Sequence, residues 1–87
     1  MQRSVVVALP EGLHARPAAQ FVAEAGKLPA KVTISKAGGT PVATASILAV
    51  MTLGVGVGDE VVLATADDDA DSVSSLDALE SFLLQSA

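Results

Sequence analysis

Residues 12–28 read GLHARPAAQFVAEAGKL and contain the clearest helical pattern in the chain. Pro17 is tolerated only in the first turn of a helix, because further in its ring clashes and its missing donor breaks the bonding. Apolar residues then recur at three- and four-residue spacing, at Ala18, Phe21, Val22, Ala25 and Leu28. The stretch therefore predicts a helix over residues 15–27, with His14 at its N-cap or just before it.

Four short runs have the composition and spacing of strands. Residues 4–9, SVVVAL, are β-branched and precede a Pro-Glu-Gly turn, and residues 31–36 alternate polar with apolar side chains. Residues 40–44 and 60–66 are the other two runs. Pro41 favours an edge position for its strand, because an edge strand can lack a donor at little cost.

Two further helices are expected. The first covers residues 46–53, with Ser46 as its N-cap and Gly54 just after its end. The second follows the acidic run DDDAD at residues 67–71, and its apolar positions are Val73, Leu76, Leu79, Phe82 and Leu83. We interpret the acidic run as favourable charge at a helix N-terminus, since it lacks the glycine and glutamate positions of a calcium loop. The order βαββαβα favours an α+β fold, a sheet with helices packed on one side.

Composition limits the possible functions. The 87 residues fit a single domain over 1–87, and the absence of cysteine excludes disulfides, thiolate catalysis and cysteine zinc sites. A net charge of −5 argues against nucleic acid as a partner. No apolar run approaches the roughly 20 residues of a membrane span, and the first ten residues are too short for a signal peptide. We therefore expect a cytoplasmic protein without membrane insertion.

The glycine-rich run GVGVG at residues 54–58 resembles a phosphate-binding loop only superficially. It lacks the Lys-Ser/Thr of a P-loop and the spacing of a dinucleotide-binding motif, so we interpret it as a turn into the last strand. Hydrolase chemistry has equally little support. The chain has no Gly-X-Ser-X-Gly elbow, and His14 is its single histidine.

His14 is the main candidate for chemistry. A neutral imidazole can attack phosphorus and form a covalent N–P bond, provided that nearby donors stabilise the phosphoryl oxygens. The backbone N–H groups of Ala15 and Arg16, the helix dipole and the guanidinium of Arg16 are such donors. The alternative is that His14 is a surface residue that merely begins the helix. The residues by themselves leave both interpretations open.

Two segments resemble one protein family. GLHARPAAQF, residues 12–21, is similar to the active-site segment of the HPr family, the histidine-containing phosphocarriers of the bacterial phosphoenolpyruvate-dependent sugar phosphotransferase system. SILAVMTLG, residues 46–54, is similar to that family's second signature. The resemblance covers essentially the whole chain. It implies an open-faced β-sandwich, in which one face of a four-stranded antiparallel sheet is covered by three helices.

The resemblance also implies a function. His14 would take a phosphoryl group on Nδ1 from phosphorylated enzyme I, ultimately from phosphoenolpyruvate, and pass it to sugar-specific IIA components. Arg16 matches the arginine that contacts the phosphoryl group, and Ile47, Leu48 and Met51 match the apolar patch that docks on partners. Such a protein is a covalent carrier rather than a free-standing catalyst, and we expect it to use no metal or cofactor and to act as a monomer.

Ser46 matches a serine that HPr kinase/phosphorylase modifies in part of the family, although it can simply cap the helix. Many relatives carry a lysine just before this serine, whereas this chain has Ala45, so we do not expect this regulation here. Two alternative functions stay open, a carrier of the nitrogen-related regulatory branch and a phosphorylation-dependent binding module. The sequence indicates neither the sugars served nor the source organism.

The charges around the histidine also depart from the family pattern. Relatives often have basic residues there, whereas we expect Glu11, Glu24 and Ala49 at this surface, with Arg16 and Lys27 as the nearby cations. Charges at the rim of an interface act mainly on the association rate. We therefore predict slower or less salt-sensitive association with a foreign enzyme I than a basic relative shows.

Overall fold

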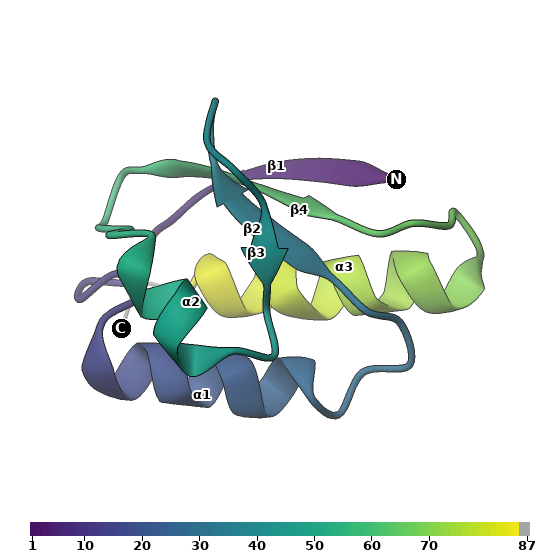
Figure 1. Cartoon of the computed structure of the whole chain (residues 1–87), viewed down its shortest axis with the longest axis horizontal. Helices are drawn as coiled ribbons and strands as arrows, with labels where there is room; N and C mark the ends of the chain where they lie inside the picture. Colours follow the sequence, from purple (N-terminus) through teal and green to yellow (C-terminus); the bar gives the residue numbers. More distant parts are fainter. Residues whose placement is uncertain (86–87) are drawn as a thin grey trace.

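The computed structural model describes residues 1–85 and has two layers, one β-sheet and one layer of helices. Its elements in chain order are β1 (Gln2–Val6), α1 (Ala15–Ala25), β2 (Thr33–Lys36), β3 (Val42–Ala43), α2 (Ile47–Thr52), β4 (Glu60–Ala64) and α3 (Ala70–Leu83). The strands form one antiparallel sheet in the order β1-β4-β2-β3, and the three helices lie on one side of it (Figure 1). The predicted α+β open-faced sandwich is confirmed.

The strand limits differ from those predicted. The first strand covers Gln2–Val6 rather than residues 4–9, because its length is set by pairing with β4 rather than by its β-branched composition. The backbone N–H of Thr65 also donates to the carbonyl of Met1, which extends the pairing toward the N-terminus. The other three strands are each shorter than predicted, and β3 is reduced to two residues after Pro41. Its predicted edge position is confirmed.

Alternating side chains of the sheet form one half of the core. Val5 lies opposite Val61 and Ile34 lies opposite Leu63, and all four side chains are buried beneath the helices. Such cross-strand apolar pairs stabilise a sheet and select its register, because a slip of one residue would turn every one of them toward solvent.

The helices supply the other half of the hydrophobic core. Phe21 of α1 and Phe82 of α3 meet edge to face, with ring centroids 5.6 Å apart. The predicted apolar face of α3 is largely correct, although Ser72 and Ser75 are buried with it. The hydroxyl of Ser75 accepts a hydrogen bond from the backbone N–H of Ala30, which satisfies both groups. Among residues 1–85, no helix is long and apolar enough to cross a membrane.

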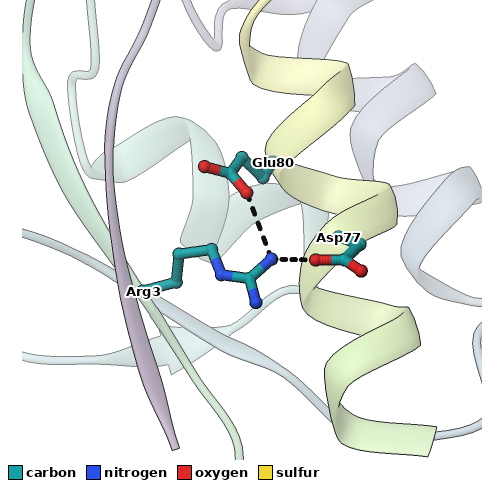
Figure 2. Close-up of polar contacts among 3 residues, drawn as sticks. All are labelled: Arg3, Asp77 and Glu80. Atoms are coloured by element: carbon teal, nitrogen blue, oxygen red, sulfur yellow. Dashed lines mark hydrogen bonds and ion pairs between the residues drawn. The ribbon is translucent and has the colours of Figure 1, made fainter. Parts of the chain in front are cut away.

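An ion cluster fastens the edge strand β1 to α3. The guanidinium of Arg3 contacts the carboxylates of Asp77 and Glu80, which lie one turn apart on the helix (Figure 2). The hydrogen bond to Asp77 raises the pKa of Arg3 above its ordinary value. The cluster therefore adds a specific polar link between the first and last elements of the chain.

Candidate functional site

His14 lies at the N-cap of α1, as predicted. Its backbone is extended, its side chain is exposed, and its imidazole makes no capping hydrogen bond. The structural contribution of the residue comes from its carbonyl oxygen, which accepts from the N–H of Ala18 at 3.4 Å. The imidazole is therefore open to solvent and contributes nothing to the cap, so it is accessible to a reaction partner.

The first turn of α1 presents unused donors beside this imidazole. The backbone N–H groups of Ala15 and Arg16 have no acceptor within the part of the chain that the structure describes, and Pro17 has no N–H to offer. Ala15 has a φ of 41°, a left-handed conformation that costs an alanine about 1 kcal/mol or more. Two free amides at a strained helix start form a place where an anion is stabilised.

Arg16 adds an exposed positive charge at the same turn. Its side chain is 78% exposed, and its nearest carboxylate oxygen, from Glu11, is 4.0 Å away. A pair this exposed constrains the guanidinium weakly, so the group is free to turn toward a ligand on His14. A hollow of about 340 Å³ beside it is lined by Glu11, Arg16 and Phe82 among others, but not by His14. The imidazole thus lies on an open surface.

The residues before His14 are held against the loop between α2 and β4. Gly12 is buried with a φ of 63°, and a Cβ at this position would overlap the carbonyl oxygen of Val55 and lie 2.7 Å from the Cα of Gly56. The N–H of Leu13 donates to that same carbonyl at 3.0 Å. The prediction that residues 54–58 form a turn into the last strand is confirmed. Its contact with the histidine loop was not predicted, because single glycines carry no signal about which backbone approaches them.

A polar cluster holds this turn in shape. The N–H of Gly56 donates to Oδ2 of Asp59 at 2.8 Å, and the N–H of Asp59 donates back to the carbonyl of Gly56 at 3.1 Å. The ammonium of Lys36 lies 3.5 Å from the same carboxylate oxygen and donates to the carbonyl of Gly54 at 3.2 Å. The bond from Gly56, with the nearby charge of Lys36, lowers the pKa of Asp59. The sequence did not indicate a role for Lys36 or Asp59, because the two residues are distant from each other in the chain.

The outer face of α2 is apolar and exposed. Ile47, Leu48 and Met51 occupy adjacent positions on this face, where a packed helix would ordinarily be polar. Val57 on the following loop is also exposed, and the sequence analysis did not identify it. The hydroxyl of Ser46 accepts from the N–H of Ala49, which confirms its predicted role as the N-cap.

Lys27 and Glu24, which we expected at the surface around His14, lie further along the chain than Arg16. Both are at the far end of α1, and Lys27 follows a helix of 11 residues, which places it more than about 15 Å from the histidine along the axis. Its ammonium lies 3.9 Å from the Glu24 carboxylate, away from the site. Arg16 and Glu11 are therefore the charged residues on the chain segment next to His14.

This chain is similar to proteins of one known family. The family model described as "PTS HPr component phosphorylation site" matches residues 1–85. The chain belongs to the HPr family. The phosphocarrier protein HPr of Streptomyces coelicolor is 49% identical over 71 residues, which cover 82% of this chain and 76% of that protein.

A solved HPr structure has the same fold, and the similar proteins also include HPr-like proteins named Crh. The crystal structure of a phosphocarrier protein HPr from Bacillus anthracis superimposes with a TM-score of 0.86 at 37% identity, covering 95% of each chain. The HPr-like protein Crh of Bacillus subtilis is 40% identical over 79 residues, 90% of this chain and 92% of its own length. The chain is thus an HPr-type phosphocarrier of the phosphotransferase system by family.

Proposed function

We propose that this protein accepts a phosphoryl group on Nδ1 of His14 from phosphorylated enzyme I and passes it to the IIA components of sugar uptake. The observation that carries the proposal is the exposed, uncapped imidazole beside two unused backbone donors and a loosely held arginine. An exposed imidazole without a hydrogen bond is accessible to a phosphoryl donor. The family membership supplies the identity of donor and acceptor.

The chemistry needs few groups. The lone pair of Nδ1 attacks phosphorus, an N–P bond forms, and the bond to the donor breaks with its electron pair leaving on the donor. The amides of Ala15 and Arg16 and the Arg16 guanidinium stabilise the negative charge of the equatorial oxygens. The same steps run in reverse toward a IIA component, with the phosphohistidine as the donor.

The exposed apolar face of α2 is the surface on which both partners would dock. Ile47, Leu48 and Met51 are available for this without rearrangement of the core. A carrier must meet a donor and an acceptor in turn, so a small surface with fast release suits it better than a deep pocket. We further propose that the protein does this as a monomer of one domain in the cytoplasm.

A two-stage transfer tests the proposal. The protein is incubated with phosphoenolpyruvate and its cognate enzyme I until intact mass shows one added phosphoryl group, and a IIA component is then added. We expect the added mass to disappear from this protein and to appear on the IIA component. Persistence of the phosphoryl group with IIA components of both the sugar and the nitrogen branch would indicate a binding module instead of a carrier.

A further inference from the structure

The loop that supports His14 is held in place by a side chain outside the histidine segment. Leu13 immediately precedes His14, and its N–H is bound to the Val55 carbonyl. Leu13 and Val55 are both completely buried, so this contact leaves little freedom to the backbone at the start of α1. The position of the imidazole therefore depends on the position of Val55.

Val55 is in turn followed by the turn that Asp59 closes. The carboxylate of Asp59 is the acceptor for Gly56, the residue just after Val55, and the return bond from the Asp59 N–H makes the closure reciprocal. Lys36 spans from this carboxylate to the carbonyl of Gly54, the residue just before Val55. The Val55 peptide is thus flanked on both sides by groups that Asp59 and Lys36 bind.

The same turn is also attached to the sheet. The N–H of Val7 donates to the Asp59 carbonyl at 2.9 Å, and the N–H of Gly58 donates to the Val7 carbonyl at 2.7 Å. These backbone bonds fix the end of the turn near β4. The hydrogen bond from the Gly56 N–H to the Asp59 carboxylate also restrains the neighbouring residue Val55. Val55 is the residue whose carbonyl accepts from Leu13.

We infer that Asp59, assisted by Lys36, is a positioning residue for His14. It holds the Val55 carbonyl where Leu13 can bind it, and this fixes the start of α1 for phosphoryl transfer. The inference rests on the proposed function of His14. Asp59 touches neither the imidazole nor the phosphoryl group, so its effect passes through the backbone of residues 55 and 13.

The test compares three variants with the unchanged protein. Asp59→Ala removes the acceptor for the Gly56 N–H, whereas Asp59→Asn keeps an oxygen acceptor and removes only the charge. Glu60→Ala is the matched control, because it removes the same charge one residue later. Within residues 1–85 the Glu60 side chain makes no hydrogen bond or ion pair. Circular dichroism of each variant establishes that it is folded.

The first measurement is phosphorylation by enzyme I, with each variant as the varied substrate. Since a displacement near 1 Å can cost about a hundredfold in rate, we expect a partly held loop in Asp59→Ala to lower kcat about tenfold. KM should be unchanged, because the apolar face of α2 is intact. Asp59→Asn and Glu60→Ala should each stay within about twofold of the unchanged protein in both constants.

The second measurement does not depend on transfer. Hydrogen exchange of the Leu13 amide should be about tenfold faster in Asp59→Ala and unaltered in Glu60→Ala, while the amide of Val50 in α2 is the internal reference. Equal behaviour of Asp59→Ala and Glu60→Ala in both measurements would overturn the inference. Equal losses in Asp59→Ala and Asp59→Asn would overturn the assignment of the effect to the hydrogen bond from Gly56. If even the unchanged protein accepts no phosphoryl group, the proposed function fails, and the exchange data alone decide the role of Asp59.

Discussion

The backbone N–H of Leu13 donates to the carbonyl of Val55 at 3.0 Å, across 42 residues of chain. This bond places the residue before His14 against the loop that follows α2. The geometry is possible because Gly12, the preceding residue, has no Cβ to collide with that loop. The position of the histidine is therefore a tertiary property, set by a contact between two loops.

Replacement of Gly12 by alanine should be severe. The new Cβ would overlap the Val55 carbonyl in a left-handed backbone, and we expect a loss of about 3 kcal/mol in the free energy of unfolding. Gly38→Ala is the control, since Gly38 also has a positive φ of 81° but nothing lies within 4 Å of the Cβ that alanine would add, and it should lose about 1 kcal/mol. Urea unfolding followed by circular dichroism measures both, and equal losses would contradict the close approach.

The fold was predictable because periodicity and turn residues follow from short-range physics. The helix stripe through Phe21, the N-cap at Ser46 and the edge strand after Pro41 all depend on neighbours within a few positions, and the structure confirms them. Strand limits were less predictable, because the length of β1 is set by its partner β4.

The site was predictable only in part, for the same reason. The sequence identified His14 and Arg16 through their adjacent positions at a helix start. It could not show that Lys36 and Asp59, 23 positions apart, meet beside Val55. The sequence also suggested that Lys27 lies near the histidine, whereas the length of α1 separates the two residues.

Arg16 should affect phosphoryl transfer more than an equally exposed cation elsewhere. We expect Arg16→Met to lower the rate of phosphorylation by enzyme I about tenfold, through loss of a charged donor to the phosphoryl oxygens. Lys27→Met is the control, because the Lys27 side chain is 75% exposed, much like that of Arg16. Its ammonium also lies near a glutamate carboxylate, at 3.9 Å. It should change the rate less than about twofold. Similar losses in the two variants would indicate a general effect of charge and not a local one.

The ion cluster of Arg3 should contribute modestly to stability. Arg3→Met leaves Asp77 and Glu80 facing each other without a cation, and with Arg3 only 25% exposed we expect a loss of about 1 kcal/mol. The loss should shrink in 1 M salt, where charges are screened within about 3 Å. Lys31→Met is the control, because that exposed lysine has no ion pair among the residues described. Salt-independent loss would contradict an electrostatic origin.

The N-cap of α3 should make stability depend on pH in one direction. The Ser72 N–H donates to Asp69, and this bond lowers the pKa of the Asp69 carboxyl below its ordinary 3.8. A lowered folded-state pKa means that the charged form stabilises the fold above the unfolded value, and that this contribution is lost as pH falls through the folded value. Asp69→Ala should therefore lower Tm at pH 7, and by less near pH 2.5.

The control for that prediction is Asp68→Ala. Its carboxylate is exposed and has no hydrogen-bond partner within residues 1–85, so its effect on Tm should be small at both pH values. A gap between Asp69→Ala and the unchanged protein that grows toward acid pH would refute the capping role of the ionised carboxylate.

The most direct test of the account is the site of phosphorylation itself. The protein, His14→Ala and Ser46→Ala are each incubated with phosphoenolpyruvate and enzyme I, and intact mass is followed before and after mild acid. We predict one acid-labile phosphoryl group on the unchanged protein and on Ser46→Ala, and none on His14→Ala. An acid-stable group, or a labile group that persists in His14→Ala, would contradict the assignment of His14 as the phosphoryl acceptor.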